Sequence, residues 1–247
     1  ACYFNLAKCL ELALNDGVCP FSGQQMGPKT GKAENFTRFD QVLEAYKAQV
    51  EYFVDMMASS LNSIEKLHAQ YSPHIYCSML LDGSIESGKD CTSGGAKYNY
   101  IGVQGVGVQD VGDSLTAIKK VVFEDKSITM KELLEALRSN FKGNEILQQR
   151  LINKVPKYGN DIDEADNMVA WAAEHYCSCF DDKYDFRGGK FRPGLFCLSS
   201  NTPLGRQVGA LPSGRLSGTP LADGGVSPKH GMDTHGPTAA AKSVAKI

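Results

Sequence analysis

The stretch DGGVSPKHGMDTHGPTAAAKSVAKI, from Asp223 to Ile247, decides how the fold of this sequence is interpreted. Its first 16 positions hold four glycines, two prolines, two aspartates and two histidines. Glycine and proline at this density favour successive turns over a helix or a strand. A short alanine-rich run follows, and the sequence stops there without a closing element. Because a helical pattern is already running at residues 4–6, we expect both ends to continue in a longer polypeptide.

The bulk composition narrows the class of protein. The chain has 247 residues, enough for one large domain or two small ones. With 22% charged residues and a net charge of -2, it has no field that would favour nucleic acid or an acidic membrane. No apolar run approaches the roughly 20 residues that span a bilayer, and no basic segment opens a signal peptide. We therefore expect a cytoplasmic protein that binds neither nucleic acid nor membrane.

The cysteine pattern matches neither a zinc ribbon nor a disulfide scaffold. No CxxC pair occurs among the eight cysteines, so free thiols in a reducing cytosol are the expected state. The eight are Cys2, Cys9, Cys19, Cys77, Cys91, Cys177, Cys179 and Cys197.

Hydrophobic periodicity predicts many helices and few strands. No linker or internal repeat divides the sequence, so residues 1–247 are expected to form a single segment. Strands that are so few need partners from elsewhere, which indicates an α/β piece. Helices are predicted over 3–16, 40–70, 113–125, from the capping box at Thr129, and over 145–154 and 163–180; strands are predicted over 75–81 and 194–199, and loop over 17–35.

Three polar or glycine-rich motifs carry little chemistry of their own. GVQGVG at residues 102–107 resembles a nucleotide-binding fingerprint, but position 110 is aspartate where glycine is required. We expect instead a close approach between elements. The acidic run 160–166 is typical of a helix N-terminus. Asp223, His230, Asp233 and His235 could hold a metal, but turn-forming hydrogen bonds explain them better, so no metal site is predicted.

Four groups of residues resemble, in order, the glycyl radical enzyme family, which includes pyruvate formate-lyase and the B12-independent diol dehydratases. Together they span nearly the whole chain. They are FNLAK and LELA at residues 4–13; TSGGAKYN and DSLTAIKK at 92–99 and 113–120; KYGND and RGGKFRPG at 157–161 and 187–194; and GALPSGR, PLADG, GPTA and SVAK at 209–215, 220–224, 236–239 and 243–246.

The resemblance implies a ten-stranded α/β barrel of two half-barrels, of which this helix-rich chain would be a part. In that family one loop carries a cysteine that becomes a thiyl radical, and another carries the glycine that stores the radical. Such radicals survive only where water, oxygen and stray hydrogen donors are excluded. A rigid wall of glycine, proline and short polar turns meets that need.

Two departures from the family pattern limit what this chain can do. The family's cysteine lies in a GCxE-type motif upstream of FNLAK, and its radical glycine in an RVxG[YF]-type motif downstream of SVAK; neither motif occurs here. We therefore expect a central-to-C-terminal segment that lacks both loops and is inactive by itself. No catalytic residue is assigned, and no cysteine, Cys2 included, receives the thiyl role.

The residues of this chain are therefore expected to line part of the substrate pocket rather than to react. The resemblance places the predicted strand from Gly194 to Asn201 inside the barrel, with alternate side chains facing substrate. Phe196 and Leu198 are therefore the first candidates for shaping the substrate pocket, although ordinary barrel core explains them equally well. Leu14 and Thr238 are weaker candidates.

The closest branch by resemblance is that of dehydratases and eliminating lyases, which act on small hydroxylated or amino-substituted substrates by radical 1,2-elimination. An arylacetate decarboxylase or a formate C-acetyltransferase is the alternative within the family, and a non-catalytic structural subunit is the alternative of another class. The resemblance implies no cofactor bound by this chain. It implies as partners the rest of the enzyme, an S-adenosylmethionine and iron–sulfur activating enzyme, and a second subunit in a homodimer, in the cytoplasm or within a bacterial microcompartment.

Overall fold

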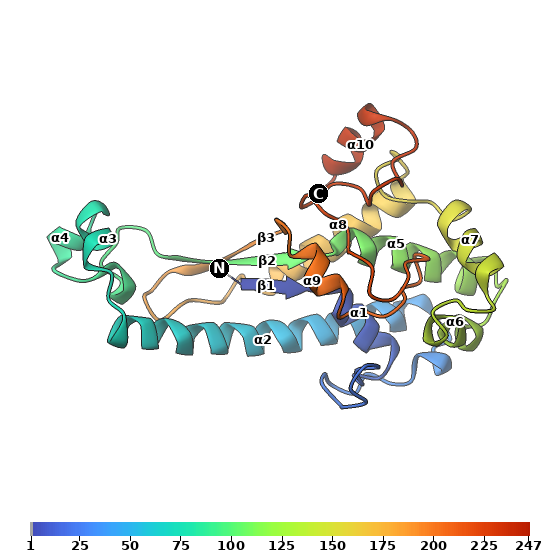
Figure 1. The fold of residues 1–247 in the computed structure, drawn as a ribbon, viewed down its shortest axis with the longest axis horizontal. Helices are drawn as coiled ribbons and strands as arrows, with labels where there is room; N and C mark the ends of the chain where they lie inside the picture. Colours follow the sequence, from blue (N-terminus) through green and yellow to red (C-terminus); the bar gives the residue numbers. More distant parts are fainter. Residues whose placement is uncertain (1) are drawn as a thin grey trace.

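Three parallel strands lie at the centre of the computed structural model, which describes residues 2–247 (Figure 1). They are β1 (Cys2–Asn5), β2 (Tyr100–Val106) and β3 (Lys190–Gly194), in the order β1-β2-β3. Cys2 lies opposite Val103, and Tyr100 lies opposite Lys190. Because all three strands are parallel, their carboxyl ends meet at one edge of the sheet.

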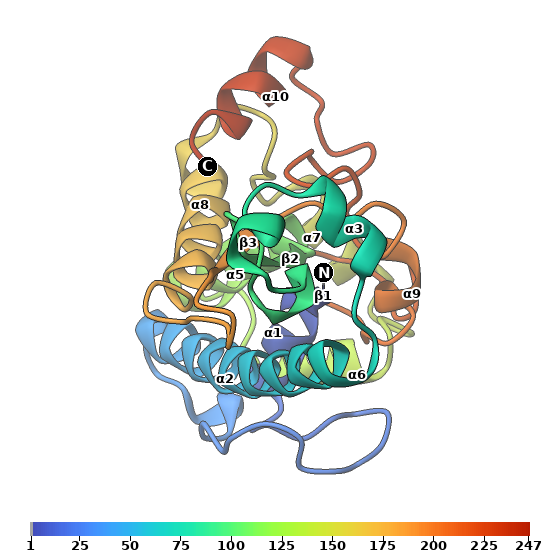
Figure 2. The same ribbon diagram turned by 90° about the vertical axis from the view of Figure 1, so that its left-hand side faces the viewer.

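The sheet has one covered face and one open face. Burial alternates along each strand, as period-two geometry requires. In Figure 2, α2 (Phe39–Tyr71) and α8 (Asp163–Ser178) lie along the same side of the strands. The covered face carries Phe4, Ile101, Val103 and Phe191, all buried, whereas the open face carries Tyr3, Tyr100, Lys190 and Arg192, all exposed.

Helices make up most of the remaining structure. The other helices are α1 (Leu6–Leu14), α3 (Ile75–Leu80), α4 (Ser84–Ser87), α5 (Val108–Ile118), α6 (Met130–Arg138), α7 (Glu145–Asn153), α9 (Asn201–Gly205) and α10 (Pro237–Val244). Among residues 2–247, no helix combines the length and the apolar character that crossing a membrane would require.

Helix α5 is the centre of the helical core, because every one of its residues is buried. It packs against α8 at Gly112. A Cβ built on Gly112 would lie 2.2 Å from Val169 Cγ2 and 2.8 Å from Val169 Cα. Only glycine therefore permits the two helix backbones to approach this closely.

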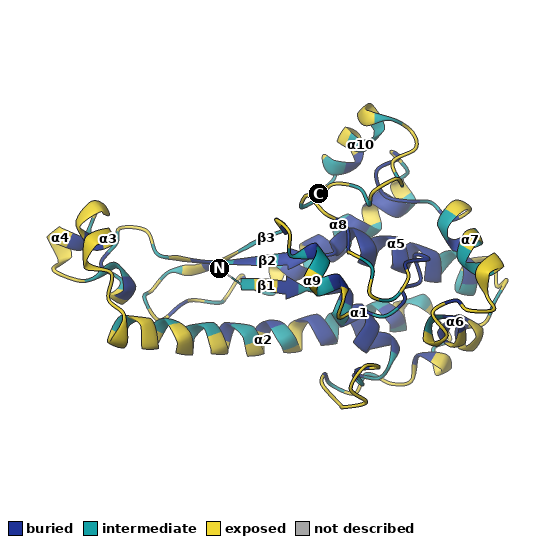
Figure 3. Ribbon diagram, in the orientation of Figure 1, coloured by how far each residue is buried: buried dark blue, intermediate teal, exposed yellow. Residues whose placement is uncertain are grey.

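Helix α2 extends far beyond this core as an arm (Figure 3). Its 33 residues span about 50 Å. Its last buried residue is Ala58, and from there to Tyr71 the helix carries only half-buried or exposed side chains. Helices α3 and α4 follow at the far end of the arm (Figure 1).

The C-terminal stretch is closed by α10, which is fixed to the first turn of α8. Ser243 Oγ donates to Asp166 Oδ2 at 2.9 Å, and Lys246 Nζ lies 2.8 Å from both Asp163 Oδ1 and Asp166 Oδ2. Asp166 is fully buried, so these contacts supply the partners that its carboxylate needs. They also confirm that the acidic run at residues 160–166 forms a helix N-terminus.

Several predictions from the sequence are confirmed. Helices occur at 39–71, 145–153 and 163–178, close to their predicted bounds. The capping box also forms: Glu132 N donates to Thr129 Oγ1 at 3.2 Å, and Thr129 N donates to Glu132 Oε2 at 2.7 Å. All eight cysteines are free, and residues 223–236 form turns.

The predicted strand over 75–81 is wrong, because Ile75–Leu80 forms helix α3. A short apolar run does not distinguish a strand from a helix by periodicity alone. The side chains of Ile75, Tyr76 and Met79 are exposed, so the apolar composition of the run does not reflect burial.

The predicted strand over 194–199 is also wrong in position. Strand β3 ends at Gly194, and the next residues form an irregular loop in which Leu198 has a φ of +49°. Strand β2 was missed entirely, although the close approach expected for GVQGVG is confirmed. A Cβ on Gly105 would lie 2.8 Å from Tyr176 Cε1 and 3.0 Å from Leu6 Cδ1.

The predicted starts of two helices are corrected as well. The helix expected from residue 3 begins at Leu6, since Cys2–Asn5 forms β1 and Asn5 caps the helix by accepting from Lys8 N at 3.1 Å. The helix expected over 113–125 begins at Val108 and continues into the wider π-type turn η3 (Lys119–Glu124).

Candidate functional site

The candidate site is the carboxyl edge of the sheet, where ligands bind in open parallel α/β sheets. Strand β2 leads through Gly107, with a φ of +84°, into α5. Strand β3 leads into the loop Leu195–Ser200 and then α9. A second loop, Leu221–Lys229, packs against both connections. We refer to these two loops together as the wall.

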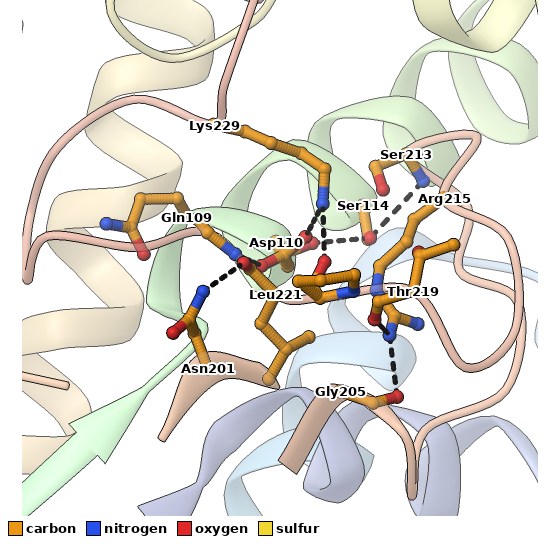
Figure 4. Close-up of polar contacts among 12 residues, drawn as sticks. Gln109, Asp110, Ser114, Asn201, Gly205, Ser213, Arg215, Thr219, Leu221 and Lys229 are labelled. Carbon is orange, nitrogen blue, oxygen red and sulfur yellow. Dashed lines mark hydrogen bonds and ion pairs between the residues drawn. The ribbon is translucent and has the colours of Figure 1, made fainter. Parts of the chain in front are cut away.

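Asp110, in the first turn of α5, attaches the second loop to the core (Figure 4). Its carboxylate is fully buried. Oδ2 accepts from Ala222 N at 2.6 Å, and Oδ1 accepts from Lys229 Nζ at 2.7 Å. The two contacts fix this loop at both ends, and the first turn of α5 favours the negative charge.

Gln109 holds the middle of the same loop. Its side chain is fully buried, and Nε2 donates to Ser227 O at 2.8 Å and also to Gly225 O. Gly225 in turn lies against the first loop, because a Cβ at this position would be 3.1 Å from Leu195 O. The two loops of the wall are therefore in direct contact.

Arg215 organises the backbone that leads into the wall (Figure 4). The side chain is buried and forms no ion pair with any residue in the range 2–247. Instead its guanidinium donates to four carbonyl oxygens, so one planar donor fork replaces four separate turn contacts. The acceptors are Gly205 and Gly209 at 2.8 Å each, Val208 at 3.3 Å, and Thr219.

Asp113 and Lys157 are two further buried ionisable residues, each bonded to a backbone group. Asp113 Oδ1 accepts from Tyr158 N at 2.9 Å, and Lys157 Nζ donates to Ser213 O at 3.1 Å. Burial raises the pKa of Asp113 to about 6, although Lys157 and the Tyr158 N–H act in the opposite direction. Burial likewise lowers the pKa of Lys157.

This raised pKa predicts a pH-dependent stability. Because the folded pKa of Asp113 is about 6 and its ordinary value is 3.8, the folded chain binds this proton more tightly. The contribution of Asp113 is therefore fully present below pH 3.8 and is lost as the pH rises through about 6. We expect Asp113→Asn to flatten the pH dependence of the unfolding free energy across this window, as measured by urea titration at several pH values. An unchanged slope in Asp113→Asn, or the same flattening in the exposed control Asp181→Asn, would contradict the assignment.

The sequence profile described as Pyruvate formate lyase-like matches residues 1–205. The chain belongs to this family. The match confirms the resemblance to glycyl radical enzymes.

Individual relatives of the Pyruvate formate lyase-like family match the chain from end to end. Trans-4-hydroxy-L-proline dehydratase of Clostridioides difficile is 40% identical over 99% of this chain and 31% of its own length. (2S)-3-sulfopropanediol dehydratase of Klebsiella oxytoca is 38% identical over 100% of this chain and 30% of its own. The solved B12-independent glycerol dehydratase from Clostridium butyricum superimposes with a TM-score of 0.95 at 47% identity, over 99% of this chain and 31% of that one. The chain thus spans about a third of the length of these relatives.

The structure brings together only two of the four predicted pocket residues. Phe196 and Leu198 both lie in the first loop of the wall, with exposed fractions of 57% and 61%. Leu14 is buried and lines a cavity of about 220 Å³ away from the wall, together with Phe21 and residues of α6. Thr238 is exposed in the first turn of α10, which stands away from the strands in Figures 1 and 2. The pocket role of all four stays a prediction.

Sequence reasoning missed the residues that hold the wall. Gln109 and Lys229 were not singled out, Asp110 entered only as a mismatch to the nucleotide-binding fingerprint, and Arg215 entered only as the last letter of a family motif. A usable signal was present, since Gln109 and Asp110 closely follow residues 101–107, in which β-branched residues are interspersed with glycine and glutamine. Among residues 2–247, no three side chains of the His, Cys, Asp and Glu types cluster as metal ligands. His235, one of the four residues considered for a metal, bonds to Asn160 O at 2.9 Å through Nδ1.

Proposed function

We propose that this chain is one segment of a glycyl radical enzyme, a lyase or dehydratase acting on a small hydroxylated or amino-substituted substrate by radical 1,2-elimination. The observation that carries the proposal is the end-to-end match to two dehydratases and to a solved glycerol dehydratase. The wall has the rigidity that shielding a radical requires, because buried contacts fix its loops.

We further propose that residues 1–247 form part of a ten-stranded barrel. The three parallel strands support this, because helices cover one face of the sheet and leave the other open, as in a barrel wall. Within residues 2–247, β1 pairs with a strand on one side only, and beyond β3 there is only an isolated bridge between Tyr184 and Lys190. Strands supplied by other polypeptide would complete both edges.

The remaining parts of the proposal concern partners. The cysteine and glycine loops would come from polypeptide outside these residues, and a radical S-adenosylmethionine enzyme with an iron–sulfur cluster would install the glycyl radical. The complete enzyme would be a homodimer in the cytoplasm, free or within a microcompartment. In this arrangement the present chain binds and orients substrate and excludes water.

The test uses the complete polypeptide that contains these residues, together with its activating enzyme, under anaerobic conditions. We expect an organic radical signal by electron paramagnetic resonance and loss of water from glycerol, trans-4-hydroxy-L-proline or (2S)-3-sulfopropanediol. Decarboxylation of an arylacetate with the same radical signal would favour the family alternative, for which the apolar Phe196 and Leu198 are suitable. Absence of any radical signal would contradict both and favour a structural subunit.

A further inference from the structure

Gln104 lies on the open face of the sheet, next to the carboxyl edge. The strand register aligns Tyr3, Gln104 and Gly194 in one row across the three strands. Side chains directly opposite in a sheet share a face, and Tyr3 is 38% exposed. This row is the last open one before the wall. In the next row on the same face, Asn5 is covered by α9, because its Nδ2 donates to Leu204 O at 3.2 Å.

The Gln104 amide is held in one orientation. Its Oε1 accepts from Phe196 N at 3.0 Å, at the start of the first loop of the wall. A backbone N–H only donates, so the amide oxygen must face Phe196 and the NH₂ group must face away. Within residues 2–247, Nε2 has no hydrogen-bond partner, so both of its N–H groups remain available.

Two glycines keep the surroundings of this amide clear. A Cβ on Gly194, the next residue in the row, would lie 2.7 Å from Gln104 Oε1. A Cβ on Gly102, which is two residues earlier on β2, would meet no atom nearer than Gln104 Nε2 at 3.8 Å. The Gln104 amide therefore fills the space that a side chain at position 194 would take. The space above Gly102, beside the NH₂ group, is open.

We propose that Gln104 is a specificity-determining residue, whose Nε2 donates a hydrogen bond to an acceptor oxygen of the substrate. Hydroxyl, carboxylate and sulfonate oxygens fit this donor, whereas an ammonium group does not. The inference rests on the proposed function, because it takes the open face as the side that meets substrate. It assigns to Gln104 two separate tasks, one toward the Phe196 backbone and one toward the ligand.

Gln104→Glu separates these tasks. A carboxylate still accepts from Phe196 N, so the loop anchor is kept, but the donor toward substrate is lost and a negative charge replaces it. We expect the Kd of the complete protein for glycerol, trans-4-hydroxy-L-proline or (2S)-3-sulfopropanediol, whichever the parent binds, to rise about tenfold or more by calorimetry. The KM should rise in parallel, and the radical signal after activation should equal that of the parent.

Gln24→Glu, at an exposed position 80 residues before Gln104, is the matched control for added charge and should leave Kd unchanged. Gln104→Leu removes both contacts, so it should weaken binding and also lower the melting temperature. A Kd for Gln104→Glu within about twofold of the parent value would overturn the inference. So would a parent that binds none of the three compounds. Failure of the proposed function is recognised separately, as a missing radical signal in the parent protein.

Discussion

Replacing Gly112 by alanine is expected to destabilise the chain by about 3 kcal/mol or more. The new Cβ would lie 2.2 Å from Val169 Cγ2, 2.8 Å from Val169 Cα and 2.9 Å from Val169 N. A rotamer change of Val169 could relieve only the first contact, because the other two involve backbone atoms. Helices α5 and α8 would have to separate, and the fully buried α5 carries the contacts that hold the wall.

The measurement is the urea midpoint of unfolding, with an m-value that stays constant. The sign of the stability change is informative. Alanine has a higher helix propensity than glycine, so the same substitution in a solvent-exposed helix would stabilise it by about 1 kcal/mol. Gly23→Ala is the control, since a Cβ there meets no atom within 4 Å and only backbone strain remains. A stability of Gly112→Ala equal to or above that of the parent would refute the close helix contact.

Replacing Arg215 by methionine is expected to destabilise the chain by about 3–5 kcal/mol. Methionine fills a similar volume but leaves the carbonyls of Gly205, Val208, Gly209 and Thr219 without their common donor. Arg215→Lys should restore little, because a lysine ammonium is a point donor and cannot reproduce the planar fork.

The loss of stability in Arg215→Met should be largest in the segment that Arg215 holds. Hydrogen exchange should show earlier opening of residues 205–222 in Arg215→Met than in the parent, whereas α5 and α8 stay protected. Arg206→Met, an exposed position in the same segment, should change stability by less than about 0.5 kcal/mol. Equal effects of the two substitutions would show that the buried fork has no special role.

The sequence allowed the prediction of elements that are specified locally. The helix over residues 40–70 and the reciprocal cap of Thr129 and Glu132 depend on neighbours within four positions, and both were located correctly. Strand β2 could not be located, because its pairing depends on residues about 100 positions away in both directions. Its glycines resembled a nucleotide-binding fingerprint, although Gly105 serves to accommodate Tyr176 and Leu6.

The site was predictable only in part for a related reason. Phe196 and Leu198 were expected to face the substrate from one strand, but both lie in a loop in which Leu198 has a φ of +49°, and their pocket role stays a prediction. Leu14 is the last residue of α1, a helix that packs in the core, and its side chain is buried there. The buried carboxylates of Asp110 and Asp113 bond to Lys229 Nζ and to Tyr158 N, and no local pattern in the sequence indicates such distant partners.

The parallel register has a consequence for synthesis of the protein. A ribosome adds residues at about 5–20 per second, so β1 would wait roughly 5–20 s for β2 to be made and as long again before β3 follows. During that time Phe4 and the apolar face of α1 lack the contacts that β2 and β3 later supply. We expect the nascent chain to depend on chaperones over this interval, and synonymous codon changes that slow translation between residues 20 and 100 to lower the soluble yield.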